Sequence, residues 1–344
     1  MNIFEQINIL LIGEKPFVCY AKPNETIGNL LIQNNSELNE FSGQSGFVFM
    51  PFDAGLKVVL PFEGNSFQTE EFVVSQKESS KAFKPSEIAE KLAFEALVSK
   101  GIVEINKGIF QKVVVSRKIV LNENLAILDT FQNLIATYQT AFRYLFFHPK
   151  IGLWMGATPE QLVKINHNNF ETVALAGTQL YSESVTWATK EIEEQQFVTD
   201  YIVAKVKDKV NKLIISNAKT VKAGNLAHLK SFISGELTTD FQLIDLIKIL
   251  HPTPAVCGLP KENAIDFILK SEGYNRKYYA GFLGEYNKDN QTDLFVNLRC
   301  LEVDNDVVNI YVGCGITKDS NPEKEFIETE NKSMTMRNIL VVNA

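Results

Sequence analysis

The apolar residues of this chain fall into runs of short strand-like segments, with helical segments between the runs. Strict alternation of strand and helix, the mark of a parallel sheet, is missing. Strand-like segments lie at 144–149, 152–157, 161–165, 170–178, 278–286, 292–303 and 306–316. Strands joined directly to each other pair antiparallel, because parallel neighbours need a long crossover. We therefore predict an α+β fold with antiparallel sheets, in one large domain over residues 1–344, since no repeat or linker divides the chain.

Helical periodicity and capping residues mark the segments between these runs. Helices are predicted at 86–101, 125–141, 189–214, 240–250 and 261–271, and from Asn321-Pro322 onward. The helix at 240–250 should stop before Pro252, since the residue before a proline avoids helical geometry. The first sixty residues predict strands and turns, and 63–85 a long exposed loop.

Charge and cysteine content narrow the class of protein. The net charge is −7, which argues against sequence-independent nucleic-acid binding, because such binding draws its affinity from Lys and Arg. No run of 18 apolar residues predicts a membrane span. The start lacks a signal-peptide pattern, with Glu5 where positive charge is wanted. The 4 cysteines are scattered, which is typical of reduced thiols. A cytoplasmic protein is expected.

Two acidic clusters are candidates for a metal site. They are KEIEEQQFVTD at 190–200 and PEKEFIETENK at 322–332, each near the start of a predicted helix. Glu325 and Glu328 are three residues apart and share a helix face. Two such helices facing each other could hold Mg²⁺, which prefers carboxylate oxygens. Acids favoured by the helix dipole on a solvated face would give the same pattern.

Several other residues could bind an anion or move a proton. Arg299 lies inside the apolar segment 292–303, where it either pairs with a carboxylate or points to solvent. Lys112 in FQKVVVSRK is either exposed on its strand or buried, and a buried lysine there could act as a base. Glycines in GCGI at 313–316 and ALAGT at 174–178 could let backbone N–H groups approach an anion, or could only form turns.

Glu160 follows a proline at a turn between strands, and a carboxyl group buried there could be a general acid. His251 could orient a substrate, although a histidine at a helix end is commonly structural. No Ser/His/Asp arrangement, P-loop or dinucleotide fingerprint is present. These residues alone indicate a metal and an anion, and leave the reaction open.

Taken together and in order, these segments resemble the chorismate-utilising enzymes. The matching segments are FQKVVVSR, GATPEQL, ALAGT, KEIEEQQFVTD, HPTPAVCGLP, YYAGFLGEY, NLRCLEV and VGCGITKDSNPEKEFIETENK. The resemblance implies a single domain of two antiparallel sheets packed face to face, with helices outside. Residues 105–335 carry the motifs and 1–100 match loosely. It also implies a chorismate substrate and Mg²⁺ as cofactor.

The resemblance assigns roles residue by residue. Glu194, Glu325 and Glu328 match the metal glutamates, and Arg299, Gly313 and Lys332 match the positions that hold substrate carboxylates. Gly177 and Thr178 match the turn that lines the ring. The rest of the substrate site is implied at His251, Ala255, Val256 and Tyr279.

The subfamily depends on Lys112 and Glu160. In the resembling enzymes that add water to C2 of chorismate, this lysine activates the water and this glutamate protonates the departing C4 hydroxyl. Both residues imply an isochorismate synthase, an isomerase, for menaquinone, siderophore or salicylate biosynthesis. Salicylate synthases, which go on to release pyruvate, also keep both residues and remain an alternative.

Other readings stay open. Ammonia-using anthranilate synthases generally lack the lysine, and aminodeoxychorismate synthases carry a lysine where this chain has Ala176. A non-catalytic relative that binds a small anion is a further alternative, for which Gln196 in place of a common acid is the hint. The resemblance implies a monomer, and no obligate glutaminase subunit is expected. Charge and hydropathy, as above, predict neither a nucleic-acid nor a membrane partner.

Overall fold

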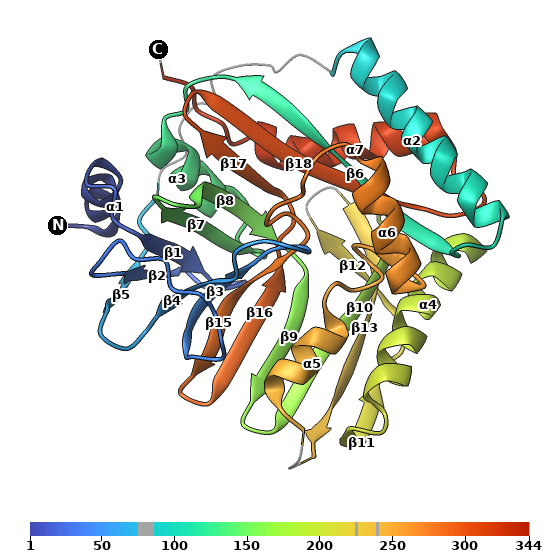
Figure 1. The fold of residues 1–344 in the computed structure, drawn as a ribbon, viewed down its shortest axis with the longest axis horizontal. Coiled ribbons are helices and arrows are strands. Elements are labelled where there is room, and N and C mark those ends of the chain that lie inside the picture. The colour runs from blue at the N-terminus through green and yellow to red at the C-terminus, as the bar shows by residue number, and fades with distance from the viewer. Residues whose placement is uncertain (75–85, 224–225, 239–240, 344) are drawn as a thin grey trace.

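The computed structural model describes residues 1–74, 86–223, 226–238 and 241–343. In these residues two antiparallel sheets face each other, which confirms the predicted fold class (Figure 1). The first sheet has the strand order β14 (Gly258–Leu259), β6 (Lys112–Asn122), β18 (Val307–Ile316), β17 (Cys300–Asp304), β8 (Gly152–Thr158), β7 (Phe142–His148), β1 (Phe17–Ala21), β2 (Ile27–Ile32) and β5 (Ser66–Glu71).

The second sheet is built from the other strands of the chain. Its order is β11 (Val210–Ile215), β13 (Leu226–Leu237), β10 (Asn169–Leu180), β9 (Gln161–Asn166), β16 (Gln291–Val296), β15 (Phe282–Lys288), β3 (Gly46–Met50) and β4 (Val58–Pro61), with β12 (Lys219–Ala223) paired to β13. Both sheets therefore combine strands from the start and the end of the chain.

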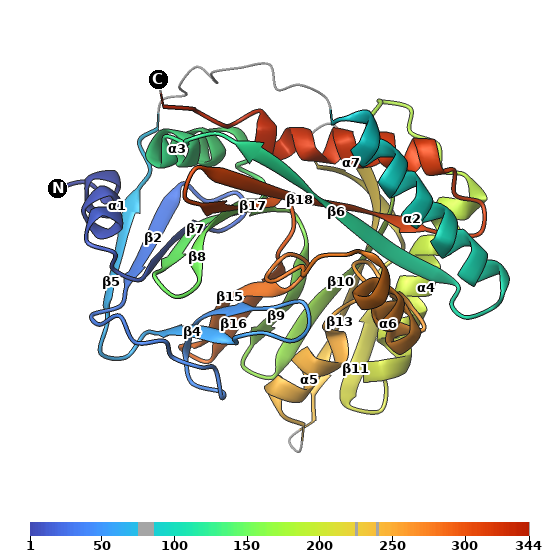
Figure 2. The same ribbon diagram turned by 45° about the horizontal axis from the view of Figure 1, so that its top comes forward.

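Helices pack on the sheets and around one end of them. They are α1 (Ile3–Ile12), α2 (Ile88–Asn106), α3 (Ile127–Thr137), α4 (Thr189–Val206), α5 (Leu243–Leu250), α6 (Lys261–Ser271) and α7 (Pro322–Arg337). The helices α2 and α7 lie together along β6 and β18 (Figure 1 and Figure 2). Helix α4 packs along β10 and β13. Within the described residues, none of the helices combines the length and apolarity that a membrane crossing requires.

Alternate residues of β1 show how the core is divided. Val18 and Tyr20 point into the cluster between the two sheets, whereas Phe17 and Cys19 join a second cluster with α1 and α3 on the opposite face. Successive side chains of a strand point to opposite faces. Because both faces are covered, this strand is apolar throughout and buried at every residue.

Two of the places where the chain crosses from one sheet to the other are adjacent. Between β8 and β9 it crosses at Pro159-Glu160, and between β16 and β17 at residues 297–299. The two crossings are hydrogen-bonded to each other: the N–H of Val296 donates to the carbonyl of Glu160 at 2.9 Å, and the N–H of Ala157 to that of Arg299 at 3.0 Å. They form a fixed junction between the sheets.

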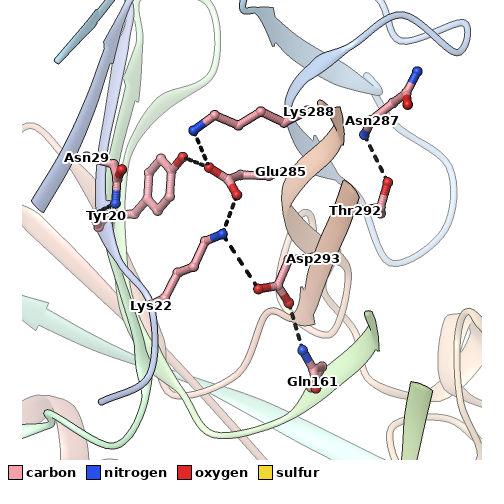
Figure 3. Close-up of polar contacts among 9 residues, drawn as sticks. All are labelled: Tyr20, Lys22, Asn29, Gln161, Glu285, Asn287, Lys288, Thr292 and Asp293. Carbon is pink, nitrogen blue, oxygen red and sulfur yellow. Dashed lines mark hydrogen bonds and ion pairs between the residues drawn. The ribbon is translucent and has the colours of Figure 1, made fainter. Parts of the chain in front are cut away.

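Away from this junction, a buried polar network joins the two sheets (Figure 3). Lys22, directly after β1, lies 2.5 Å from Glu285 of β15 and 3.9 Å from Asp293 of β16. Glu285 also accepts hydrogen bonds from Tyr20 and, at 2.9 Å, from Lys288. Each carboxylate buried here has a partner, as burial of a charge requires.

Several predicted elements differ in the structure. The loop predicted at 63–85 contains strand β5, and its residues 75–85 lie outside the described residues. The segment containing NILLIG forms helix α1, because Asn2 and Glu5 make a capping box at its start. The helix predicted to reach residue 214 ends at Val206, and β-branched residues after it form β11. Helix α2 continues past Gly101, where the missing side chain lets it approach Val113 of β6.

Candidate active site

A pocket opens where β6, β10 and β18 meet the helices α4 and α7 and the two sheet crossings. It brings together most of the residues predicted from the sequence. Those lining it are Lys112, Glu160, Gly177, Glu194, Ala255, Val256, Tyr279, Arg299, Gly313, Glu325, Glu328 and Lys332. Thr178 lies in β10, and its side chain is outside the described residues.

Lys112 begins β6 and is buried, with 4% of the residue exposed. Its Nζ lies 2.6 Å from Oε1 of Glu194 on α4. The glycine at 315 in the neighbouring strand makes room for this pair, since a Cβ there would lie 3.1 Å from both Oε1 of Glu194 and Cε of Lys112. The predicted base and a predicted metal ligand therefore contact each other directly.

Glu160 lies at the first sheet crossing and is 7% exposed. Burial raises the pKa of its carboxyl group to about 7, against the opposing effect of the cations Lys112, Lys332 and Arg299 nearby. A carboxyl group with this pKa is partly protonated at neutral pH. It can therefore donate a proton, as a general acid must.

Arg299 corrects the prediction of one continuous strand over 292–303. Residues 297–299 are the second sheet crossing, and Arg299 adopts a left-handed conformation with φ of 48°. Its Nη1 donates to Thr335 of α7 at 3.2 Å, and the side chain lines the pocket. The guanidinium thus reaches the pocket because it leaves the strand.

An aromatic pair forms another part of the wall. The ring of Tyr279 stacks on Tyr311 of β18, with centroids 5.5 Å apart and an interplanar angle of 15°. The close packing depends on Gly313, because a Cβ there would lie 2.9 Å from the Tyr279 hydroxyl. Tyr279 and Tyr311 thus form an aromatic part of the pocket wall next to Gly313.

Helix α7 supplies charges of both signs to the pocket. It begins at Pro322, and the side chain of Asn321 accepts a hydrogen bond from the backbone N–H of Lys324. Lys332 lies 2.6 Å from Glu328 one turn earlier and donates to the carbonyl of Gly313 at 2.9 Å. The cap fixes where the helix begins, and the Lys332 contact holds the helix against β18.

His251 lies apart from these residues, contrary to its predicted place in the substrate site. Helix α5 ends at Leu250, as predicted, and the histidine ring packs edge-on against Phe282 with centroids 4.9 Å apart. It lines a separate hollow with Phe52 and Ile247. Burial lowers the pKa of His251 to about 4, so the ring is neutral at pH 7.

Glu191 and His228 are pocket residues with functional side chains that were not predicted from the sequence. Glu191 lies one turn before Glu194 on α4, and the spacing of three residues in the acidic cluster could have identified it. His228 of β13 reaches the pocket through an Nδ1 contact of 3.1 Å with the carbonyl of Gly177. Burial lowers the pKa of His228 to about 4. No motif in the sequence marks it.

Gln196, the residue that hinted at a non-catalytic relative, lies outside the pocket. It is exposed on α4, and its amide donates to Asp200 at 2.7 Å. Its departure from the family pattern does not alter the pocket wall.

The carboxylates of the pocket fit a divalent cation. Glu191 and Glu194 come from α4, and Glu325 and Glu328 from α7. Oε2 of Glu191 is buried without a hydrogen-bond partner, an arrangement that a bound cation would satisfy. Among the described residues, no three acidic, histidine or cysteine side chains are already arranged around a metal position. Glu194 and Glu328 are instead paired with lysines.

The fold and the pocket together define a protein with a buried, charged cavity between two antiparallel sheets, suited to a small anion and a metal. A family model described as chorismate binding enzyme matches residues 63–341. The chain belongs to this family.

Curated relatives share this region. Anthranilate synthase component 1 of Archaeoglobus fulgidus is 30% identical over 250 residues, which cover 70% of this chain and 60% of that protein. The isochorismate synthase MenF of Haemophilus influenzae is 28% identical over 248 residues, covering 69% of this chain and 57% of that protein. The chain thus spans less than two thirds of the length of these relatives.

A solved structure shows the same fold. The crystal structure of a putative 2,3-dihydroxybenzoate-specific isochorismate synthase from Bacillus anthracis superposes with a TM-score of 0.79 at 22% identity. The superposition covers 95% of this chain and 96% of that one. The chain therefore shares its fold with a protein described as a putative isochorismate synthase.

Proposed function

We propose that this chain is an isochorismate synthase, which converts chorismate reversibly to isochorismate with Mg²⁺. The observation that carries the proposal is the meeting of Lys112 and Glu160 in one buried pocket, with the pKa of Glu160 raised to about 7. The relatives named isochorismate synthase add support.

In this proposal Lys112 takes a proton from water as the water oxygen bonds to C2 of the ring. The ring double bonds shift, the C4–O bond breaks, and Glu160 gives its proton to the departing hydroxyl. One hydroxyl is gained and one lost, so the product is an isomer. Proton exchange with water then restores both residues.

Positive charge in the pocket would hold the two carboxylates of the substrate. Arg299 and Lys332 line the pocket and can each form a charge-assisted hydrogen bond to a carboxylate. Glu194, Glu325 and Glu328, with Glu191 beside them, would hold Mg²⁺. Bound there, the ion would supply the charge that fixes the ring carboxylate and neutralises these acids. It would also compete with Lys112 for Glu194.

Incubation of the purified protein with chorismate and Mg²⁺, with chromatography of the products, tests the proposal. We expect a mixture of chorismate and isochorismate, free of pyruvate and abolished by EDTA. Lys112→Ala and Glu160→Gln should each lower turnover about 10²–10⁴-fold. Full activity of Lys112→Ala would disprove the role of the base. Pyruvate formed together with salicylate would make the chain a salicylate synthase.

An ammonia-using synthase is a second candidate, because anthranilate synthase component 1 of Archaeoglobus fulgidus is 30% identical over 250 residues. This function predicts an aminated product that appears only when ammonium is added. The same chromatography with and without ammonium separates the two candidates. We further propose that the protein acts as a monomer without a glutaminase subunit, which gel filtration of the active protein would test.

A further inference from the structure

Two charged side chains that do not line the pocket are buried directly behind its wall. Glu272 follows helix α6, and Arg276 lies four residues later, with side chains 1% and 2% exposed. Nη2 of Arg276 lies 2.5 Å from Oε1 of Glu272, and Nε donates to Oε2 at 2.8 Å. Burial of an ion pair has a desolvation cost that its own attraction often fails to offset. The pair therefore needs an explanation beyond stability.

The remaining donors of Arg276 hold backbone carbonyls of the pocket wall. Nη2 donates to the carbonyl of Val114 at 2.7 Å, and Nη1 to that of Val256 at 3.0 Å. Both residues line the pocket. Val114 lies on β6 two residues after Lys112, whereas Val256 belongs to the loop after α5. One guanidinium thus fixes the spacing between two parts of the wall.

The carboxylate of Glu272 holds β6 at a second point. Its Oε1 accepts hydrogen bonds from the backbone N–H of Ser116 at 2.6 Å and from the Ser116 hydroxyl at 2.9 Å. Ser116 pairs with Gly313 in the ladder between β6 and β18. The ion pair therefore contacts β6 on both sides of Val115.

The guanidinium of Arg276 also lies against aromatic rings. Its guanidinium lies 4.4 Å from the ring centroid of Phe52 and 5.9 Å from that of Tyr279, the aromatic residue of the pocket wall. A planar guanidinium can stack on rings while its edge donates hydrogen bonds, which an ammonium group cannot do. Arginine is thus the side chain that this position requires.

We propose that Arg276, held by Glu272, is a positioning residue. It sets the placement of β6, the 253–257 loop and Tyr279 around the substrate without touching the substrate itself. As a statement about catalysis this rests on the function proposed above; as a statement about the pocket wall it stands on the contacts alone.

Arg276→Lys tests both statements, because the substitution keeps the positive charge but cannot make all of the hydrogen bonds that Nε, Nη1 and Nη2 of the guanidinium donate. We expect turnover of chorismate to fall about 10–100-fold through misplacement of Lys112, since small displacements of a reacting group have large effects. KM should change less than about threefold, because Arg299 and Lys332 are untouched. Hydrogen exchange of the protein without substrate or metal should increase in 112–116 and 253–257 alone.

Arg143→Lys is the matched control. Arg143 is also a buried arginine that donates to backbone carbonyls, those of Lys22 at 2.9 Å and Glu25 at 2.7 Å, but it lies away from the pocket. It should lower the melting temperature without changing turnover per folded molecule. If Arg276→Lys behaves in the same way, with full turnover and unchanged exchange in 112–116 and 253–257, the positioning role is wrong.

Glu272→Gln is a second variant, in case Arg276→Lys folds poorly. It can still accept the Ser116 hydrogen bonds, but it lacks the charge that fixes Arg276. We expect the same two segments to exchange faster and turnover to fall. A wild-type chain inert toward chorismate would end the proposed function, while the exchange of these segments would still decide whether the pair holds the wall.

Discussion

At the scale of single residues, the pocket combines groups whose charge depends on their surroundings. Glu160 is buried near three cations and still has a raised pKa, because removal from water outweighs their attraction. Lys112, by contrast, has a carboxylate within 2.6 Å. The two residues proposed to handle protons thus differ in their nearest charged partners within one pocket.

The raised pKa of Glu160 has a consequence for stability. A carboxyl group whose folded pKa lies above its unfolded value of 4.5 contributes full stability below pH 4.5, and this is lost as pH rises to about 7. Glu160→Gln should match wild type in free energy of unfolding at pH 4 and exceed it by about 3 kcal/mol at pH 8. Denaturant unfolding at both pH values measures this. A difference that stays constant with pH would contradict the raised pKa.

The charged residues of the pocket could be predicted from the sequence better than the directions in which individual side chains point. Lys112 and Glu160 could be predicted because each belongs to a motif with a known chemical role. For His251, the end of the helix was predicted, but the direction of the ring depends on packing against Phe282, which lies far away in the sequence. His228 could not be predicted, since only its pairing opposite Thr178 brings it to the pocket.

At the scale of elements, helix α7 shows how local capping serves the site. Asn321 and Pro322 start the helix just before Glu325, so the cap determines where the acidic face begins. This helix start could be predicted from sequence. The strand break at residues 297–299 could not, because continuous apolar character does not reveal that β16 and β17 belong to different sheets.

Removal of the α7 cap should affect both stability and metal use. Asn321→Ala loses the hydrogen bond to Lys324 and should lower the free energy of unfolding by about 1 kcal/mol. Because the first turn carries Glu325, the Mg²⁺ concentration for half-maximal turnover should rise. Asn2→Ala removes the cap of α1, far from the pocket, and should cost similar stability without changing the Mg²⁺ requirement. Equal Mg²⁺ requirements in the two variants would show that the α7 cap does not affect metal use.

At the scale of the whole molecule, the sheets are joined at the crossings and at the network around Glu285 (Figure 3). Burial tends to raise the pKa of Glu285, but the charge and hydrogen bond of Lys22 and the hydrogen bond of Tyr20 outweigh it, and the pKa is lowered. Asp293 in the same network has its pKa raised by burial, despite Lys22 nearby. The network thus favours the charged form of Glu285, whereas it does not offset the effect of burial on Asp293.

These opposite shifts predict opposite mutant effects. A lowered folded pKa gives stability that is present above the unfolded value and lost as pH falls through the folded pKa. Glu285→Gln should therefore lower the unfolding free energy at pH 7 by about 1–3 kcal/mol, reduced by the partial exposure of Lys22, with the difference shrinking below about pH 4. Asp293→Asn should be neutral or stabilising at pH 7. Thermal unfolding across pH tests both, and equal losses would rule out this reading of the network.

The overall class of fold followed from the runs of strands, and the order of strands within the sheets did not. Neighbours such as β1 and β7, or β6 and β18, are separated by long stretches of chain and are selected by which faces can be buried together. Local periodicity carries no information on that choice.

The arrangement of the strands also has a consequence for how the protein is made. The pocket needs Lys112 from β6 and Lys332 from α7, and β6 gains its β18 neighbour only when residues 307–316 have been added. A chain emerging from the ribosome would carry β6 without its β18 neighbour through most of its synthesis, and unpaired strand edges are exposed to aggregation. The complete pocket would therefore form only late, once residue 332 is free to fold.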